Sequence, residues 1–339
     1  MAIENSKGIL ITGGTGTFGK AFLKTIIKRF PNIPRIVIYS RDEYKQWEMT
    51  NEFPVDEFPN LRFFIGDIRD LKRFSVALKG IDTVIHAAAL KQVPAAEYNP
   101  IEFIRTNVLG TENIVQACLE NEVKTVISLS TDKAASPINL YGATKLCADK
   151  LITAANNISG SKNIKFSVVR YGNVLGSRGS VIPLFINKSK MGELPITDSK
   201  MTRFNITINE AVDFVISVIN DSLGGEIFIP KLSSYKIMDV ANAIGPNCRH
   251  NILGIRDGEK IHEEMITTSD SINTIDLGNK YAILPADGSI LEKYKSLNIK
   301  FKKVLEGFSY NSLNNDNFLS ISEIRDLILK HVDKDFIPR

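Results

Sequence analysis

The sequence predicts an α/β protein built on a doubly wound parallel sheet, followed by a smaller α/β lobe. Short runs rich in Ile, Val and Phe alternate with helical stretches, and these runs lack the polar alternation of a sheet with one wet face. A glycine-rich loop follows the first run directly. Strands that are buried on both faces and separated by helices form parallel sheets. We expect the sheet from residues 1–174, and the lobe with a C-terminal helix from residues 175–339, with later segments able to return to the sheet.

The expected elements follow in order along the chain. Strands are expected at residues 9–12, 35–39, 61–65, 83–87, 124–129 and 165–170. Helices are expected between them at residues 18–29, 42–52, 70–78, 100–121 and 140–157. Beyond residue 174 the expected elements are helices at 183–191 and 208–220, strands at 226–230 and 251–254, and a helix at 320–331. The last helix opens with a Ser-x-x-Glu capping box.

Composition limits the class of function. The chain has 339 residues, 43% hydrophobic and 24% charged, which is typical of a globular enzyme with a large core. Its net charge of +4 is dispersed, so we expect no nucleic-acid partner. No apolar run reaches about 18 residues and a strand begins at Ile9, so we expect no membrane span, no signal peptide and a cytoplasmic location. The cysteines and histidines show no metal-ligand spacing, so we expect no metal.

The loop at residues 13–19 predicts a dinucleotide site. It follows the first strand and opens a helix. Glycines allow the backbone to approach a pyrophosphate, and the N-terminus of a helix offers N–H groups to it. Cofactor contacts are expected from Gly13, Thr15, Gly16, Thr17, Phe18 and Gly19.

The residues after the second strand indicate which dinucleotide is bound. Ser40 and Arg41 stand where NAD enzymes usually place an acid, and Lys45 lies nearby. A hydroxyl and two cations suit a 2′-phosphate, so we expect NADP. The alternative is that Arg41 pairs with Asp42 or Glu43 in solvent. Further cofactor contacts are expected from Asp42, Glu43, Asp67, Ile68, Ala87, Ala88, Lys91 and Val174.

The segment after the fifth strand carries acid–base groups. Thr131, Asp132 and Lys133 lie where an α/β sheet binds ligands, and Tyr141 and Lys145 share one face of the next helix. An ammonium at Lys145 would lower the pKa of the Tyr141 phenol, which suits acid–base work near neutral pH. Taken alone, Tyr-x-x-x-Lys could be an incidental pair on a surface helix.

Taken together, the motifs at residues 12–19, 66–67, 86–89, 131–133, 141–145 and 170–174 resemble the extended short-chain dehydrogenase/reductase family, a Rossmann-fold family. Residues 90–94, 96–100, 130–145, 176–181, 201–204 and 254–260 resemble its inverting UDP-N-acetylglucosamine 4,6-dehydratases. The resemblance runs from about residue 8 to about 316. Asn205 departs from it, because the subfamily usually has an aromatic residue there.

The resemblance implies a mechanism. Tyr141 and Lys145 would serve hydride transfer between sugar C4 and NADP, Thr131 would hold the C4 oxygen, Lys133 would remove the C5 proton and Asp132 would protonate the C6 hydroxyl. Hydride return to C6 and reprotonation of C5 from the opposite side would give UDP-2-acetamido-2,6-dideoxy-β-L-arabino-hex-4-ulose. A base must be neutral, so we expect Lys145 or burial to depress the pKa of Lys133. The alternative for Lys133 is an ion pair with Asp132.

The resemblance also implies a site for UDP-N-acetylglucosamine. Arg178, Arg203 and Arg256 are candidates to bind the pyrophosphate, although each could be a surface charge. Asn173 would contact the sugar and Glu259 the uridine ribose. Further substrate contacts are expected from Lys91, Leu109, Gly110, Thr197 and Asn314. The family implies a homo-oligomer, often a hexamer, and a product that feeds pseudaminic acid and related sugars.

Three alternatives stay open. A retaining 4,6-dehydratase carries Thr-Asp-Glu where this chain has Thr131, Asp132 and Lys133. A UDP-sugar 4-epimerase needs the Tyr–Lys pair without the Asp132–Lys133 pair. A non-catalytic NADP-binding regulator needs neither pair. The presence of both pairs therefore favours the inverting dehydratase.

Overall fold

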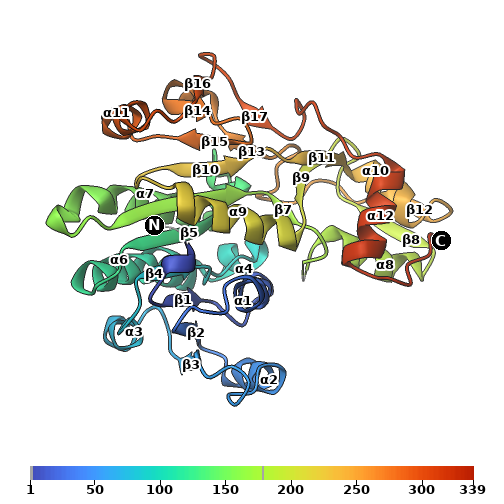
Figure 1. Cartoon of the computed structure of the whole chain (residues 1–339). Coiled ribbons are helices and arrows are strands. Elements are labelled where there is room, and N and C mark those ends of the chain that lie inside the picture. The colour runs from blue at the N-terminus through green and yellow to red at the C-terminus, as the bar shows by residue number, and fades with distance from the viewer. Residues whose placement is uncertain (1–2, 178) are drawn as a thin grey trace.

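The computed structural model describes residues 3–177 and 179–339. Its centre is a 10-stranded sheet in the order β16-β14-β15-β10-β6-β5-β4-β1-β2-β3 (Figure 1). The strands from β3 to β10 in this order pair in parallel. They are β1 (Ile9–Thr12), β2 (Ile36–Ser40), β3 (Leu61–Ile65), β4 (Thr83–His86), β5 (Thr125–Thr131), β6 (Lys165–Tyr171) and β10 (Ile227–Pro230). The order 3-2-1-4-5-6 is that of the Rossmann sheet, which confirms the predicted fold class.

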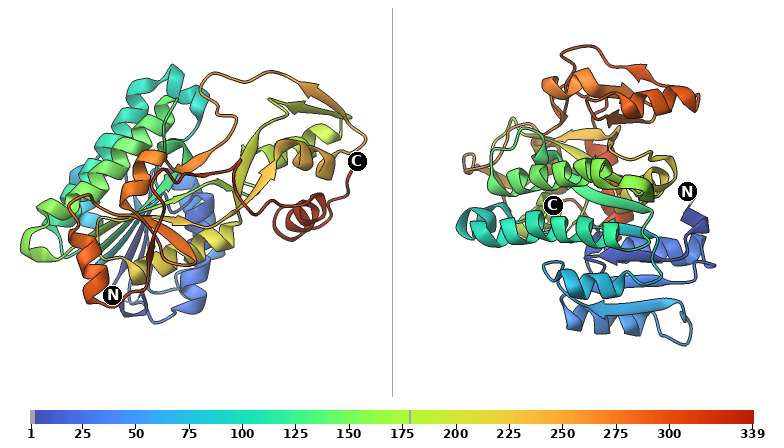
Figure 2. Two further views of the ribbon diagram at one scale, coloured as in Figure 1. Left: turned by 90° about the horizontal axis from the view of Figure 1, so that it is seen from above. Right: turned by 90° about the vertical axis from the view of Figure 1, so that its left-hand side faces the viewer.

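Helices cover both faces of this sheet (Figure 2). One face carries α3 (Leu71–Ala77), α6 (Gly110–Glu120) and α7 (Leu140–Ile158). The other carries α1 (Thr17–Arg29), α2 (Glu43–Glu52) and α9 (Ile208–Asp221). Successive residues of each strand serve opposite faces, so that in β1 Leu10 packs with the first set and Ile11 with the second. Burial on both faces is the reason why the strands lack polar alternation.

The elements predicted for the first half of the chain are present, with ends that differ by a residue or two. The exception is the helix expected at 100–121. It consists of α5 (Pro100–Phe103), a π-helical turn at Ile104–Leu109, and α6; a short α4 (Val93–Tyr98) precedes it. Asn107 in the π-helical turn accepts a hydrogen bond from the Leu90 N–H (2.8 Å) and donates one to the Leu90 carbonyl (2.9 Å). The turn therefore anchors the loop after β4, beside the carboxyl end of the sheet.

The later chain is shared between the sheet and a lobe. The strand expected at 226–230 is β10, which joins the sheet. Three antiparallel strands extend the sheet beyond β10: β14 (Thr274–Asp276), β15 (Lys280–Ile283) and β16 (Lys302–Lys303). The helix α11 (Ser289–Ser296) lies between β15 and β16 in the chain. The lobe, on the right in Figure 1, has its own hydrophobic core. It contains α8 (Val181–Ser189), β8 (Glu193–Ile196), β9 (Thr202–Ile206), β11 (Ser233–Lys236), α10 (Ile237–Ile244), β12 (Arg249–Ile252) and α12 (Ile321–His331). The position of the domain boundary at 174 stays a prediction.

Two small ladders lie beside the central sheet, and the first connects it to the lobe. The strand β7 (Asn173–Val174) continues from β6 and pairs with β9. The strand β13 (Glu264–Ile266) pairs with β17 (Tyr310–Asn311). Across residues 3–177 and 179–339, no helix has the length and apolar character needed to cross a membrane.

A buried ion pair joins α7 to β6. Nη2 of Arg170 lies 3.2 Å from Oδ2 of Asp149, and the two side chains are 3% and 0% exposed. Asp149 also accepts a hydrogen bond from the Ser130 hydroxyl at 2.7 Å, and Arg170 donates to the Met265 carbonyl at 3.0 Å. This network fixes α7 against the ends of β5 and β6, which is where the candidate site begins.

The substitution Asp149→Ala should lower the free energy of unfolding by about 3–5 kcal/mol, because it leaves the Arg170 guanidinium buried without its counter-ion. Urea denaturation followed by circular dichroism measures the change. Asp213→Ala is the matched control. It breaks the exposed Arg29–Asp213 pair, with side chains 52% and 50% exposed, and should cost less than about 1 kcal/mol. Equal losses for the two variants would contradict this prediction.

Candidate functional site

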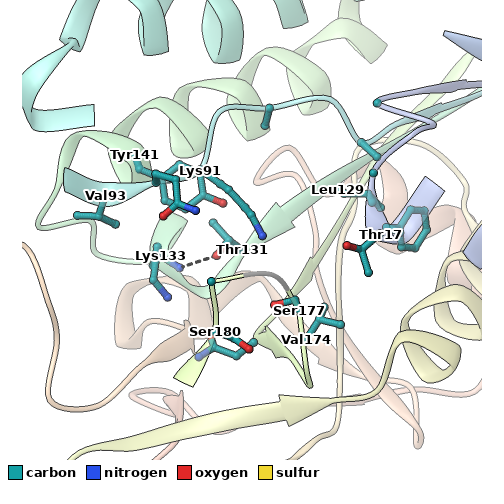
Figure 3. A pocket seen from close by; sticks show the side chains of 18 of the residues that line it. Thr17, Lys91, Val93, Leu129, Thr131, Lys133, Tyr141, Val174, Ser177 and Ser180 are labelled. Atoms are coloured by element: carbon teal, nitrogen blue, oxygen red, sulfur yellow. Dashed lines mark hydrogen bonds between the residues drawn. The ribbon is translucent and has the colours of Figure 1, made fainter. Parts of the chain in front are cut away.

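A cavity of about 1300 Å³ lies at the carboxyl ends of the parallel strands and reaches the lobe. Sheets of this topology bind ligands in this position. The lining comes from the β1–α1 loop, the ends of β2 to β6 and lobe residues that include Thr197 and Arg256. In Figure 3, Thr17 and Leu129 lie toward one end, and Lys133, Thr131, Tyr141 and Lys91 toward the other. The cavity is therefore long enough to bring a cofactor loop and acid–base groups into one space.

The β1–α1 loop makes a close backbone approach to the neighbouring strand end. Gly13 has a φ of +63°, and a Cβ there would lie 2.9 Å from the Ala88 Cα. At Gly19 a Cβ would lie 2.5 Å from the Gly14 Cα, so α1 can start this close to the loop only with glycines. The cap residue of α1 is Gly16, which has no side chain to satisfy the first amides. Those amides are therefore suited to an anionic ligand.

The cations after β2 are paired with carboxylates. Nη1 of Arg41 lies 3.5 Å from Oδ2 of Asp67, and Nζ of Lys45 lies 2.6 Å from Oδ2 of Asp42. Asp42 also caps α2 through the Lys45 N–H. Arg41 is therefore paired with a carboxylate, as the alternative prediction had it, but its partner is Asp67 and not Asp42 or Glu43. All four side chains line the cavity, together with Ser40.

The acid–base segment is held by local hydrogen bonds. Thr131 ends β5 and caps the 3₁₀ turn Asp132–Ala134. Asn139 then caps α7 by accepting the Gly142 N–H at 2.8 Å. A Cβ at Gly142 would lie 2.2 Å from the Lys133 carbonyl oxygen, so the helix starts directly against the turn. This contact brings Tyr141 next to Thr131 and Lys133, as Figure 3 shows.

The predicted effect of Lys145 on Tyr141 is wrong. Burial raises the pKa of Tyr141 to about 12, and the groups that lower it in part are Lys133 and the Thr131 hydroxyl. The Lys145 amine donates to the Leu129 carbonyl at 2.8 Å. Burial lowers the pKa of Lys145, although Asp149 opposes this shift. Sequence spacing placed both residues on one helix face, but it could not show where the amine points.

The predicted depression of the Lys133 pKa is also wrong. Nζ of Lys133 lies 3.2 Å from Oδ1 of Asp132 and 2.9 Å from Oε1 of Glu263. Burial lowers the pKa of Lys133, but the two carboxylates outweigh it and hold the pKa above its ordinary value. The alternative, an ion pair with Asp132, is present. Sequence reasoning missed Glu263, which lies 130 residues away in the chain and has no spacing that marks it.

The lobe arginines differ in their freedom to bind a ligand. Arg256 is 58% exposed and lines the cavity, 3.9 Å from Glu259. Arg203 also lines the cavity, but its guanidinium donates to the carbonyls of Thr202 (2.8 Å), Ile261 (2.9 Å) and Lys260 (2.9 Å). Binding a pyrophosphate would require Arg203 to give up these bonds, so its geometry fits a structural role better. Arg178 lies outside the described residues.

Most of the other predicted contacts line the cavity. They are Gly13, Thr15, Gly16, Thr17, Phe18, Gly19, Ile68, Ala87, Ala88, Lys91, Asn173, Val174, Thr197 and Glu259. Four lie elsewhere among the described residues. Glu43 and Leu109 are exposed on their helices, Gly110 packs against Ile68, and the Asn314 N–H donates to the Asn311 side chain at 2.9 Å in an exposed turn. Across the two described ranges, no group of His, Cys, Asp and Glu could hold a metal.

Comparison with known proteins identifies the family. Residues 9–285 match the family described as "Polysaccharide biosynthesis protein". The chain belongs to the polysaccharide biosynthesis protein family. This family member is 53% identical to a Campylobacter jejuni protein named "UDP-N-acetylglucosamine 4,6-dehydratase (inverting)", over 96% of this chain and 98% of the relative. The resemblance predicted from the sequence is thereby confirmed.

Two further relatives bear on the interpretation. A Rickettsia akari protein named "UDP-glucose 4-epimerase" is 42% identical, over 95% of both chains. The X-ray structure titled "Pen from Bacillus thuringiensis" superposes with a TM-score of 0.86 at 38% identity, and covers 97% of this chain and 98% of that one. The fold is therefore shared along nearly the whole chain. The names of the Campylobacter and Rickettsia relatives indicate different reactions, a dehydration and an epimerisation, on related sequences. The residues of the site therefore distinguish the two reactions better than overall identity does.

In this family member, Gly142→Ala should lower the free energy of unfolding by about 1–3 kcal/mol, because the added methyl group overlaps the Lys133 carbonyl. The shift of the urea denaturation midpoint measures this. Cys147→Ala, at an exposed position of the same helix, should have little effect. A midpoint for Gly142→Ala equal to that of the native protein would show that the turn and the helix are not in tight contact.

Proposed function

We propose that this protein is a UDP-N-acetylglucosamine 4,6-dehydratase that inverts C5 of the sugar. The observation that carries the proposal is the Asp132–Lys133 pair, which lies at the end of β5 beside Tyr141. An elimination needs an acid and a base close together in addition to the Tyr141–Lys145 pair, whereas a 4-epimerisation needs only that pair. The 53% identity to a protein of that name supports the same reaction.

A nicotinamide dinucleotide fits the cavity as cofactor. The approach of Gly13 to Ala88 and the uncapped start of α1 leave a backbone surface for a pyrophosphate. A nicotinamide bound there would supply the hydride chemistry that oxidation at sugar C4 and reduction at C6 require. We favour NADP, because Ser40, Arg41 and Lys45 line the cavity at the end of β2 and suit a 2′-phosphate.

Each residue of the chain then has a distinct task. Tyr141 takes the C4 hydroxyl proton, with Thr131 as hydrogen-bond partner of the C4 oxygen. The Lys133 ammonium first passes its proton to Asp132, 3.2 Å away, because the carboxylates otherwise keep the amine charged. The neutral amine of Lys133 then takes the C5 proton, which the 4-ketone has made acidic. Asp132 donates a proton to the departing C6 hydroxyl. Burial and the charge of Glu263 raise the pKa of Asp132, although Lys133 lowers it, and the net shift suits an acid that must carry its proton.

The substrate's nucleotide would extend toward the lobe. Arg256 is the exposed cation for the pyrophosphate, and Thr197 and Glu259 line the same side of the cavity. Asn173 and Lys91 line the part nearer the acid–base groups. Assembly into a homo-oligomer, a cytoplasmic location and a role in pseudaminic acid synthesis stay predictions from the resemblance.

The reaction can be tested with UDP-N-acetylglucosamine in heavy water. The sugar should lose one water and gain deuterium at C5 with inverted configuration. Mass spectrometry measures the loss of water, and NMR measures the position and configuration of the deuterium. Loss of no water would contradict the dehydratase, and conversion to the C4 epimer would favour the epimerase. Deuterium at C5 with retained configuration would contradict inversion.

Lys133→Ala should bind NADP as the native protein does but lose elimination by at least about 100-fold, because the base is missing. The rate of water loss measures elimination, and titration calorimetry measures NADP binding. Lys150→Ala removes an exposed lysine of α7 and should keep the native rate. An unchanged rate for Lys133→Ala would remove Lys133 from the mechanism.

Arg41→Ala should weaken NADP binding about 10-fold and leave NAD binding nearly unchanged, because a charge-assisted hydrogen bond contributes about 1.5–3 kcal/mol. Titration calorimetry with each cofactor measures this. Lys24→Ala, at an exposed position of α1, is the control for a loss of positive charge. Equal losses for NADP and NAD would contradict the preference for NADP.

A further inference from the structure

A buried cluster of charges surrounds the base. We define the charge cluster as Asp132, Lys133, Arg203 and Glu263. Lys133 contacts both carboxylates, and Nε of Arg203 lies 3.7 Å from the Glu263 oxygen that Lys133 also contacts. The Glu263 side chain is 2% exposed. A buried carboxylate in direct contact with a catalytic amine therefore belongs to the site, although no motif pointed to it.

The backbone of Glu263 is fixed. Its N–H donates to the Ser312 hydroxyl at 2.9 Å, and its carbonyl accepts the Ser312 N–H at 2.8 Å. The Ser312 hydroxyl in turn lies 2.7 Å from the Thr202 hydroxyl, which ties the segment to β9. The carboxylate therefore reaches Lys133 from a rigid support, whereas Lys133 itself sits on a short turn.

The two carboxylates of the cluster differ in their electrostatic surroundings. Burial raises the pKa of Glu263, but Lys133, Arg203 and Lys260 outweigh it and lower the pKa overall. The net shift for Asp132 is upward. Among the described residues, neither Oδ2 of Asp132 nor Oε2 of Glu263 has a hydrogen-bond partner. Glu263 is thus the member of the pair that stays ionised, and Asp132 is the one suited to hold a proton.

We propose that Glu263 is a positioning residue for the dehydratase reaction: it fixes the Lys133 amine and supplies the counter-charge to the ammonium that forms when Lys133 takes the C5 proton. The inference rests on the proposed function. A base that is oriented by a third group, which stabilises the charge the base acquires, is a recurrent arrangement in catalysis. Because Glu263 is the carboxylate that stays ionised beside Lys133, Asp132 can hold the proton that it donates.

The step balances without another reactant. The C5–H bond breaks and its proton binds Nζ of Lys133, while the electron pair forms the C5–C6 double bond. The C6–O bond breaks, and the oxygen leaves as water with the proton of Asp132. Lys133 ends as an ammonium and Asp132 as a carboxylate. The positive charge that appears during the step therefore forms 2.9 Å from the Glu263 oxygen.

The titration of the Asp132–Lys133 pair depends on all the charged groups that face it. Removal of the Glu263 charge should lower both apparent pKa values of the pair, because an anion stabilises the protonated form of either group. Four other titratable groups among the described residues also act on the pair, and the substitution leaves them in place. They are Arg203 of β9, Lys260 in the loop before β13, Tyr141 of α7 and Tyr235 of β11.

The test is the pH dependence of kcat for water loss in Glu263→Gln. The maximal kcat should fall by roughly 10- to 100-fold, a part of the factor that general acid–base catalysis usually contributes. Both limbs of the profile should move to lower pH, and KM should change little. Glu263→Asp keeps the charge and should restore the native position of the limbs, even if its rate stays low.

The matched control is Glu264→Gln. It removes the same charge at the next residue, whose side chain accepts a hydrogen bond from the Ser136 hydroxyl at 3.2 Å instead of contacting Lys133. The kcat for water loss and its pH profile should therefore stay unchanged. A Glu263→Gln profile that stays in place, with native or reduced rate, would overturn the proposal, because a packing role does not move pH limbs. Absence of water loss in the native protein would instead overturn the proposed function.

Discussion

The parallel pairing of β5 with β6 is the constraint on which the site depends. Its register runs over seven residue pairs, from Thr125 with Lys165 to Thr131 with Tyr171. The two strands therefore end side by side, and Asp132 emerges next to Gly172. A Cβ at Gly172 would lie 3.5 Å from Oδ2 of Asp132 and 2.6 Å from the Phe204 Cβ, so this exit has room only for glycine. Charged groups that leave buried strand ends have little access to water, and each must find its partner within the protein.

That requirement explains the arrangement of charges below and around the cavity. Beneath the strand ends, Arg170 and Asp149 satisfy each other and hold α7 in place. Above them, Lys133 lies between Asp132 and Glu263, with Arg203 behind. The lower pair has one partner for each charge and serves stability. In the upper cluster Lys133 contacts both carboxylates, but Arg203 lies against Glu263 alone, and this asymmetry separates the pKa values of the carboxylates in the direction that acid–base chemistry needs.

Local patterns predicted what depends on neighbours in the chain. Apolar runs placed the parallel strands, and residues 13–19 and 131–145 were recognised because their functional groups lie within one loop or one strand–helix turn. The prediction failed where distant segments decide. Glu263 lies in a stretch for which the sequence predicts no element and no motif. Arg203 stays a predicted pyrophosphate ligand, but in the structure its guanidinium donates to the carbonyls of Thr202, Lys260 and Ile261. The pKa shift of Tyr141 depends mainly on burial, and that of Lys133 also depends on Glu263 and Arg203, which are far away in the chain; sequence spacing shows neither effect.

The separation of Glu263 from Lys133 by 130 residues has a consequence for biosynthesis. A ribosome-bound chain that has emerged only as far as α7 already contains the glycine loop, Tyr141 and Lys133, but Lys133 does not yet have the carboxylate of Glu263 beside it. The strands that support Glu263 come from β9 and β17, and β17 is among the last elements to be made. With the role proposed for Glu263, full turnover therefore requires the final part of the chain to have docked, and a polypeptide without β17 keeps Lys133 but lacks the support of its carboxylate partner.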